Sequence, residues 1–402
     1  MSINHQLFKM LEKITNSIDI SESQYKDAEQ KYLAVGKYLS EGEYCLLDEK
    51  ICLVNGEIYA QGSMKLNTVV KPIGQEEFDI DLVFYTPNIC ISKMPPEKLK
   101  ELIGDRLKSE TSRYKDKVYS TNRGWCIKYA NQFHLDITPS LEKLNEPDND
   151  SELVADRDLS KYMSSNPKGY AKWFENIALQ IPKIRSTQEL FRSSLFMDGI
   201  SIAIEESASV TELPKHEPSK LLLKRFVQIF KRHRDEMYKN ETRLDKKNKP
   251  SSIIITTLAA HAYLDCIEKN EYHNEYDLMV DVLKLMPNYI IPRDDIDWIE
   301  NPTVNDENFA EKWEKKPCRK KRFLDWNSSC ISFFENFHPN MGQNILLDSL
   351  EEGFGKKATE LIREEYIQEL DRNRKDGLIK TSTVIATSSV PIKAKANTFY
   401  GK

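Results

Sequence analysis

The stretch QGSMKLNTVVKPIGQEEFDIDLVFY, residues 61–85, sets two aspartates one residue apart inside an apolar, β-branched run. Side chains two positions apart on a β-strand point to the same face of the sheet, so Asp79 and Asp81 project together while their apolar neighbours enter the core. Like charges at this spacing repel each other and raise a pKa unless a cation lies between them. The segment therefore predicts a buried strand that presents a carboxylate pair to divalent metal.

A third aspartate lies in a second short strand-like run, FHLDITPS, residues 133–140. Asp136 stands between Leu135 and Ile137, so its carboxylate also leaves an apolar strand. Three such carboxylates could hold two Mg²⁺ ions, for which Mn²⁺ can substitute. A D-x-D pair alone is more often a solvated strand face than a metal site, so the prediction depends on what surrounds the pair.

The residues before the acid pair supply that context. Gly62 and Ser63 directly follow the strand-like run EIYAQ, residues 57–61. A Gly-Ser turn presents backbone N–H groups and a hydroxyl to an anion. An ordinary turn would also explain a Gly-Ser pair, but a Gly-Ser turn followed by an acid pair and then by a lone strand aspartate is much less common. This order favours a phosphate site beside bound metal.

Periodicity divides the chain into a mixed first part and a helical second part. The strand-like runs lie at residues 57–63, 77–85, 117–130 and 133–140, with an amphipathic run at 95–114 and two helices within residues 5–40 that we expect to pack on the sheet. From about Asn176 onward the pattern is helical. We therefore expect an α+β fold with a sheet lobe and N-terminal helices at 1–175, a helical lobe at 176–380 and a tail at 381–402.

Composition restricts the setting. The chain has 402 residues and a formal net charge of -5, which gives no global field for long nucleic acid. Its seven cysteines form no CxxC pair and no zinc-site spacing, which is typical of reduced, cytosolic thiols. No apolar run approaches the roughly 18 residues of a membrane span, and the start of the chain lacks the apolar core of a signal peptide. These features predict a cytoplasmic protein.

Several motifs together resemble a known superfamily. QGSMKLNTVVKP, EEFDIDLVFY and FHLDITPS are similar to the core signature of the polymerase-β-like nucleotidyltransferases, and within them to the bacterial cGAS/DncV-like nucleotidyltransferases (CD-NTases) of anti-phage signalling. KPSSIIITTLAAHAY, residues 249–263, resembles the helical-lobe segment that these enzymes share with oligoadenylate synthases and cyclic GMP-AMP synthase. Residues 299–313 and the terminal NTFYGK also resemble segments of the bacterial group. The resemblance spans residues 61–402 and implies a polymerase-β-like sheet lobe, a C-terminal helical lobe and a central cleft.

The resemblance implies a role for each acid. Asp79 and Asp81 would share both Mg²⁺ ions, while Asp136 would bind mainly the ion that activates the acceptor hydroxyl. Two metals serve both ends of an in-line displacement at phosphorus, so no protein nucleophile is required.

The phosphate contacts follow from the same resemblance. Gly62 and Ser63 would cradle the β- and γ-phosphates of the donor, and a lysine and a serine of the helical lobe would complete the triphosphate site. The candidates are Lys224 and Ser252, with Lys220 and Ser251 as close rivals. Ser252 would open a helix whose exposed N–H groups face the anion.

The implied activity is joining NTPs, ATP among them, into a cyclic di- or trinucleotide second messenger of CBASS-type anti-phage signalling, with release of pyrophosphate. Two alternatives stay open. The chain could modify an RNA end, a protein or a small molecule with a nucleotide, or it could be a catalytically silent nucleotide-binding sensor or scaffold. The intact acids argue against the silent alternative.

Three further features carry weaker predictions. The basic runs at 231–250 and 315–323 are predicted to be solvated surface, because acids interleave the first and no aromatic ladder accompanies them. His134 shares the strand face of Asp136 and either orients the site or packs. The tail is predicted to dock on its own chain through an edge strand at 382–390; the alternative is a handle for regulatory or effector proteins.

Overall fold

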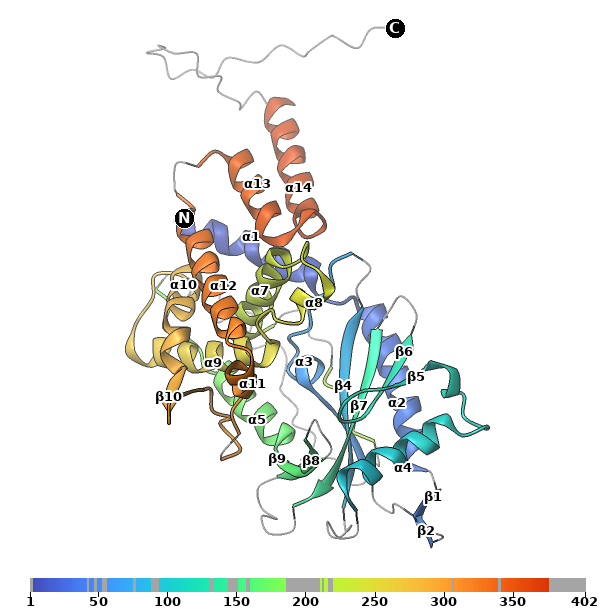
Figure 1. Cartoon of the computed structure of the whole chain (residues 1–402). Helices are drawn as coiled ribbons and strands as arrows, with labels where there is room; N and C mark the ends of the chain where they lie inside the picture. Colours follow the sequence, from blue (N-terminus) through green and yellow to red (C-terminus); the bar gives the residue numbers. More distant parts are fainter. Residues whose placement is uncertain are drawn as a thin grey trace, which may run out of the picture.

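A mixed sheet and a bundle of helices form the two lobes of the computed structural model (Figure 1). The structure describes residues 3–41, 43–46, 49–52, 56–74, 77–87, 94–129, 133–143, 151–156, 160–185, 210–211, 213–215, 220–305, 307–338 and 341–375. This arrangement confirms the expected α+β fold with a sheet lobe and a helical lobe.

The sheet has seven strands, and its central pair is parallel. The main path runs β3-β4-β7-β6-β5, with β8 added to β7 and β9 added to β8. The bounds are β3 Glu57–Gln61, β4 Phe78–Thr86, β5 Val118–Ser120, β6 Trp125–Tyr129, β7 Phe133–Glu142, β8 Glu152–Ala155 and β9 Tyr162–Ser165. Only β4 and β7 are parallel among these neighbours.

Strand β4 shows the alternation that the sequence predicts. Phe78, Ile80 and Leu82 are buried, whereas Asp79 is exposed and Asp81 is half-buried. The apolar residues join one core with helices α2 (Glu22–Ser40) and α4 (Pro96–Lys108). Their carboxylate neighbours therefore remain on the other face of the sheet.

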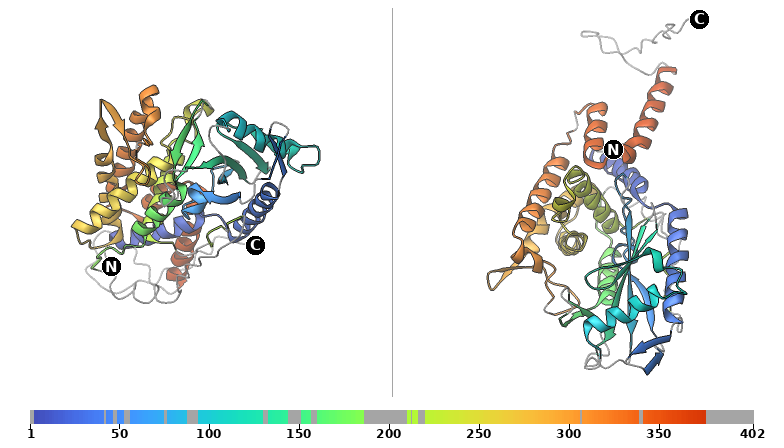
Figure 2. Two further views of the ribbon diagram at one scale, coloured as in Figure 1. Left: turned by 90° about the horizontal axis from the view of Figure 1, so that it is seen from below. Right: turned by 45° about the vertical axis from the view of Figure 1, so that its right-hand side comes forward.

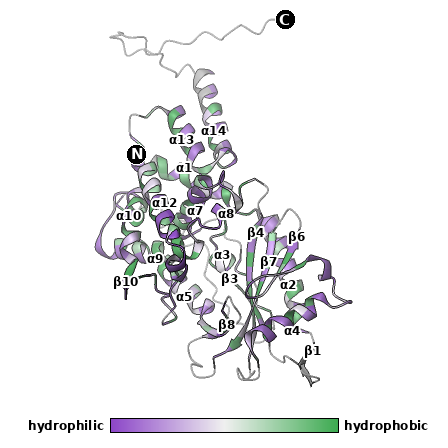
Figure 3. Ribbon diagram, viewed as in Figure 1, coloured by the Kyte–Doolittle hydropathy of each residue, from purple (hydrophilic) through white to green (hydrophobic). Residues whose placement is uncertain are grey.

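The helical lobe has its own core. Its longer helices are α1 Ile3–Ile18, α5 Pro167–Ala178, α7 Leu222–Met237, α9 Ser252–Lys269, α10 Glu275–Leu285, α12 Cys318–Glu335, α13 Gln343–Phe354 and α14 Lys356–Lys375. The short elements are α3 Gly62–Lys65, α8 Arg243–Lys246, α11 Glu311–Lys315, the hairpins β1 Glu43–Leu46 with β2 Glu49–Cys52 and β10 Ile291–Arg293 with β11 Ile296–Trp298, and two 3₁₀ turns, η2 Lys115–Lys117 and η4 Met286–Tyr289. In Figure 3, α4 and α14 each mix hydrophobic and hydrophilic positions, as expected of helices with one buried face.

The two N-terminal helices belong to different lobes. Helix α2 packs on the sheet, which confirms the prediction for this helix. Helix α1 packs instead against α7, α10 and α14, so the prediction that both helices pack on the sheet is wrong for α1 (Figure 2). Its Leu7, Phe8 and Leu11 form one apolar stripe at helical spacing and are buried in the helical core.

Helix α5 also packs in the helical core, through Tyr170, Phe174 and Ile177. The predicted boundary at residue 176 therefore falls inside a helix that packs as one unit. The predicted tail at 381–402 lies outside the described residues, and its docking stays a prediction. No helix in the described ranges combines the length and the apolar character that crossing a bilayer requires.

Candidate functional site

The parallel pairing of β4 with β7 brings the three predicted acids together. Asp81 lies directly opposite Asp136 in the strand register, and Asp79 lies opposite His134. On the other side of β4, Asp81 pairs with Gln61, the last residue of β3. Acids that are 55 positions apart in sequence (81 and 136) thus become neighbours on one face of the sheet.

The acids are incompletely neutralised by the protein. Burial, and then the charges of Asp79 and Asp136, raise the pKa of Asp81 to about 7. Asp136 Oδ1 is buried and has no hydrogen-bond partner among the described residues. Burial and the neighbouring Asp136 carboxylate raise the pKa of the Cys126 thiol to about 12, so that thiol stays protonated. This arrangement favours the binding of a cation.

His134 lies beside the acids and not among the core side chains. Its Nε2 makes an ion pair with Glu77, and its Nδ1 lies 3.4 Å from Asp79 Oδ1. The ring therefore links two carboxylates, which supports the orienting role over simple packing.

The three aspartates fit divalent metal by their chemistry, since carboxylate oxygens are the ligands of Mg²⁺. The orphaned Asp136 oxygen and the raised pKa of Asp81 are observations of this structure that support that fit. Within the described ranges, however, no three His, Cys, Asp or Glu side chains are already gathered at metal-site spacing. Asp79, whose side chain is 65% exposed, would have to turn from His134 toward Asp81 to complete a site.

The Gly-Ser turn lies against this acid pair. Gly62 begins the short helix α3 directly after β3 and has a φ of +61°, a conformation that favours glycine. A Cβ atom at Gly62 would lie 2.4 Å from Asp81 Oδ2, so the acid and the turn are in close contact. The carbonyl of Ser63 accepts a hydrogen bond from Thr68 N at 3.0 Å, which closes the turn.

One face of α7 contacts the segment that follows this turn. Gln228 Nε2 donates to the carbonyl of Val69 at 2.7 Å, and Lys231 Nζ donates to Thr68 Oγ1 at 2.9 Å. Three positions on this face, Lys224, Gln228 and Lys231, follow helical spacing and are all buried. A buried polar stripe therefore joins the helical lobe to the phosphate turn.

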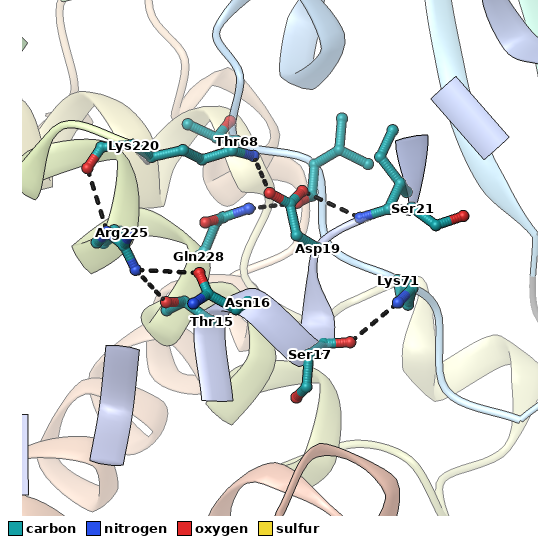
Figure 4. A network of polar contacts seen from close by, with 12 residues as sticks. Thr15, Asn16, Ser17, Asp19, Ser21, Thr68, Lys71, Lys220, Arg225 and Gln228 are labelled. Atoms are coloured by element: carbon teal, nitrogen blue, oxygen red, sulfur yellow. Dashed lines mark hydrogen bonds and ion pairs between the residues drawn. The ribbon is translucent and has the colours of Figure 1, made fainter. Parts of the chain in front are cut away.

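The end of α1 holds the same segment from the other side. Lys71 Nζ donates to the carbonyl of Ser17 at 3.1 Å, and Lys220 forms a 2.7 Å ion pair with Asp19 (Figure 4). Arg225 on α7 donates to Thr15 Oγ1 at 2.8 Å. Lys220, one of the predicted phosphate ligands, is therefore engaged in this structural network.

The α7 lysine whose charge acts on Asp81 differs from the predicted one. Lys224 makes a 2.9 Å ion pair with Glu175 and is 2% exposed. Lys231 lies further along the same face of α7, where the charge of Asp81 acts on it. Burial, and then the nearby Arg234, lower the pKa of Lys231 to about 7, so an incoming anion would restore its charge.

Sequence reasoning missed Lys231 because it assigned residues 231–250 to solvated surface. That prediction is wrong for Lys231, Arg232, His233 and Arg234, which are 4–6% exposed. The signal that could have revealed Lys231 is the repetition of polar residues at i, i+4 and i+7 from Lys224, which places all three on one face of the helix. By contrast, residues 315–323 remain mostly exposed, as expected.

The two candidate serines open α9 and differ in their contacts. Ser251 is the N-cap residue, makes no side-chain cap bond and lines a cavity. Ser252 Oγ accepts a hydrogen bond from Arg234 Nη1 at 3.0 Å. Ser251 is therefore the serine that lines the cavity and makes no side-chain cap bond.

The cavity lies between the lobes and has a volume of about 200 Å³. Arg123 and Met163 line it from the sheet lobe, and Lys249, Ser251 and Glu307 line it from the helical lobe. The charge of Lys249 acts on Asp79, so the cavity lies near the acids. The expected central cleft is present at this point.

Comparison with known proteins identifies relatives along nearly the whole chain. Residues 1–177 match the family described as Second Messenger Oligonucleotide or Dinucleotide Synthetase domain. The chain is 27% identical over 410 aligned positions to the c-di-GMP synthase of Roseivirga ehrenbergii, with 98% of this chain and 97% of the relative covered. It is 26% identical over 264 positions to the cyclic dinucleotide synthase CdnG of Bradyrhizobium diazoefficiens, covering 63% and 58%.

Solved structures share the fold. The CD-NTase CdnG of Bradyrhizobium diazoefficiens in complex with GTP aligns with a TM-score of 0.62 at 21% identity, covering 89% of this chain and 98% of that one. The apo form of Vibrio cholerae DncV aligns with a TM-score of 0.51 at 17% identity, covering 88% and 82%. The sheet acids, the Gly-Ser turn and these matches agree: residues 1–177 match the second-messenger synthetase domain, and the whole chain is similar to the bacterial cGAS/DncV-like nucleotidyltransferases.

Proposed function

We propose that this nucleotidyltransferase joins NTPs into a cyclic di- or trinucleotide second messenger and releases pyrophosphate at each bond. The observation that carries the proposal is the register of β4 and β7, which sets Asp81 opposite Asp136 with Asp79 two residues away on the same face. Three carboxylates on one sheet face are what a two-metal displacement requires.

The acids have distinct roles in this proposal. Asp79 and Asp81 would hold both Mg²⁺ ions, and Asp136 would hold mainly the ion that activates the acceptor hydroxyl. The ions supply charge neutralisation at the α-phosphate and lower the pKa of the attacking hydroxyl. The raised pKa of Asp81 and the unpartnered Asp136 oxygen support this assignment, since both describe carboxylates that lack a counter-charge.

The donor triphosphate binds the Gly62–Ser63 turn in this proposal. The backbone of Gly62 approaches Asp81 closely, so phosphate oxygens at the turn would lie beside the ions. Lys231 and Ser251 complete the triphosphate site, and their positions beside Thr68 and in the cavity support them over Lys224 and Ser252. Lys224 then holds Glu175 and stabilises the helical lobe.

Guanine nucleotide is among the proposed substrates. The Roseivirga relative is named c-di-GMP synthase, and the Bradyrhizobium structure is a complex with GTP. ATP remains a proposed second substrate. The enzyme is proposed to act in the cytoplasm within CBASS-type anti-phage signalling, and regulatory or effector proteins engaging the C-terminal tail remain part of the proposal.

Labelled NTPs test the reaction. The purified chain is incubated with Mg²⁺ and radiolabelled NTPs, treated with phosphatase, and its products are resolved. A phosphatase-resistant product is expected, because a cyclic product has no terminal phosphate. Label on a macromolecule would indicate transfer to RNA or protein, and no conversion would indicate the silent sensor; either result would reject the proposal.

A further inference from the structure

The cavity between the lobes has the size of part of a nucleotide. Its volume of about 200 Å³ is smaller than the ~300–1,000 Å³ typical of a pocket that holds a whole ligand. Phe309 and Ile253, both partly buried, and the buried Ile254 provide apolar walls. A flat ring with polar edges fits such a lining, with its phosphates outside the cavity.

The cavity opens beside the proposed phosphate and metal ligands. Ser251 lines it at the start of α9, and Lys249 lines it while its charge acts on Asp79. On the sheet side, Arg123 lies in the β5–β6 turn, three residues before Cys126, which pairs with Asp136. A base in this cavity would therefore belong to a nucleotide whose phosphates reach the acids.

Most polar groups of the lining are already engaged. Asn308 Oδ1 accepts from the backbone N–H groups of Ile299 and Ala310 at 2.9 and 2.8 Å. Its Nδ2 donates to the Asp297 carbonyl at 2.9 Å, so the amide holds the loop and has little capacity left for a ligand. Arg319 is likewise used, donating to the Lys247 carbonyl at 2.8 Å.

Glu307 and Arg123 are lining side chains whose hydrogen-bonding capacity is not fully used. Glu307 Oε2 accepts a 2.6 Å hydrogen bond from Asn301 Nδ2, while Oε1 has no hydrogen-bond partner among the described residues. Arg123 Nε is buried and without a partner in the same ranges, and its only hydrogen bond there is from Nη2 to Met163 Sδ at 3.9 Å. The two side chains face the same cavity but make no ion pair in the described structure. A ligand between Arg123 and Glu307 could accept a hydrogen bond from the arginine and donate one to the carboxylate, which would satisfy both groups.

We propose that Glu307 and Arg123 read a guanine base in this cavity. The Glu307 carboxylate accepts hydrogen bonds from guanine N1–H and N2–H₂, and Arg123 donates to O6. Adenine fits less well, because its N1 is an acceptor and would face a carboxylate, and because the asparagine that could read it is saturated. This inference rests on the proposed function, of which it names one substrate and the residues that select it.

Nucleotide analogues that cannot react test the selection apart from catalysis. The probes are α,β-methylene analogues of GTP, ITP and ATP, titrated calorimetrically with Mg²⁺ present. ITP keeps O6, N7 and N1–H but lacks the N2 amine. Wild type is expected to bind the GTP analogue roughly tenfold or more tighter than the ITP analogue, because one hydrogen bond to a charged group is lost.

Glu307→Gln is expected to bring the GTP and ITP affinities within about threefold of each other. Its amide oxygen can still accept from Asn301, so the loop is retained while an NH₂ group faces the guanine donors. Glu311→Gln is the matched control: it removes another carboxylate of the same cavity lining and should keep the wild-type ratio. Arg123→Lys should weaken GTP and ITP together and leave ATP unchanged.

Two outcomes would overturn the inference: a GTP-to-ITP ratio unchanged in Glu307→Gln, or an equal loss of all three nucleotides with a wild-type melting temperature. Pyrophosphate release from GTP by the wild-type chain is measured separately. Selective binding without pyrophosphate release would reject the proposed function and keep the base assignment. Pyrophosphate release without Glu307-dependent selection would keep the proposed function and reject the base assignment.

Discussion

The two lobes treat buried charge in opposite ways. In the helical lobe, Asp235 contacts both Arg234 and Lys249, at 2.9 and 2.7 Å, and burial of these charges is compensated by their pairing. In the sheet lobe, Asp81 and Asp136 face each other, and neither makes an ion pair in the described part of the chain. Paired charges of the first kind hold a structure together, whereas adjacent acids without a counter-ion destabilise the protein until a ligand neutralises them.

The largest expected effect comes from removing a charge from the acid pair. Asp81→Asn should lower pyrophosphate release by roughly 10³-fold or more, because several kcal/mol of metal-dependent stabilisation are lost. The melting temperature of the metal-free protein should stay the same or rise slightly, since repulsion is relieved. Asp105→Asn, on the exposed face of α4, is the control. Turnover within tenfold of wild type would show that this acid is not a metal ligand.

Breaking a paired charge should act on stability instead. Arg234→Met removes the hydrogen bonds of Arg234 to Asp235, to the Pro250 carbonyl and to Ser252. The free energy of unfolding should fall by about 3 kcal/mol in urea titrations. Arg363→Met breaks the partly exposed contacts with Asp348 and Glu351 and should cost less than about 1 kcal/mol. Equal losses of unfolding free energy in the two variants would show that buried and exposed ion pairs contribute alike to stability.

Lys231 and Lys224 lie on the same face of α7, and only Lys231 is proposed to bind nucleotide. Lys231→Met should weaken NTP binding by roughly 10- to 100-fold through the loss of charge-assisted bonds, and it should also lower the free energy of unfolding by about 1–3 kcal/mol, because the buried Thr68 acceptors lose their donor. Lys224→Met should leave Glu175 without its 2.9 Å partner and lower stability while NTP affinity stays near wild type. Calorimetric titration and urea denaturation of both variants measure the difference. The opposite pattern would restore Lys224 as the phosphate ligand.

A smaller effect is expected at the phosphate turn. Gly62→Ala adds a methyl group where a Cβ would lie 2.4 Å from Asp81 Oδ2, at a φ of +61°. NTP affinity should fall about tenfold, since the added methyl group would displace Asp81 from the turn that is proposed to hold the triphosphate. Gly74→Ala provides the control, because Gly74 has a φ of +70° and nothing within 4 Å of a Cβ. Equal NTP affinities in the two variants would count against close contact between turn and acid.

The smallest expected effect is a pH dependence in the sheet lobe. Burial raises the pKa of Glu152 to about 7 from 4.5, although Tyr59 and Ser140 donate hydrogen bonds to it. The folded state thus binds a proton that the unfolded chain has released, so this contribution to stability is present at low pH and is lost as pH rises through about 7. Melting temperature should fall between about pH 5 and about pH 8, and less steeply in Glu152→Gln. An identical slope in both proteins would reject this carboxyl as the cause.

The sequence alone was sufficient to predict the local features of the site. Period-two alternation around Asp79 and Asp81 determines which side chains leave the core, and the same pattern marks Asp136. The Gly-Ser turn and the two-lobe order also follow from residues close together in the chain. These features depend on neighbours within a few positions, which a sequence displays directly.

Tertiary structure decided how separate segments meet. The parallel register that sets Asp81 opposite Asp136, the assignment of α1 to the helical core and the contact of Lys231 with Thr68 all depend on contacts between distant segments. The cavity shared by Arg123 and Glu307 likewise needs both lobes in place. Packing of one helix face against a particular loop is a long-range energy term, and periodicity gives the face of a helix but not the surface that it meets.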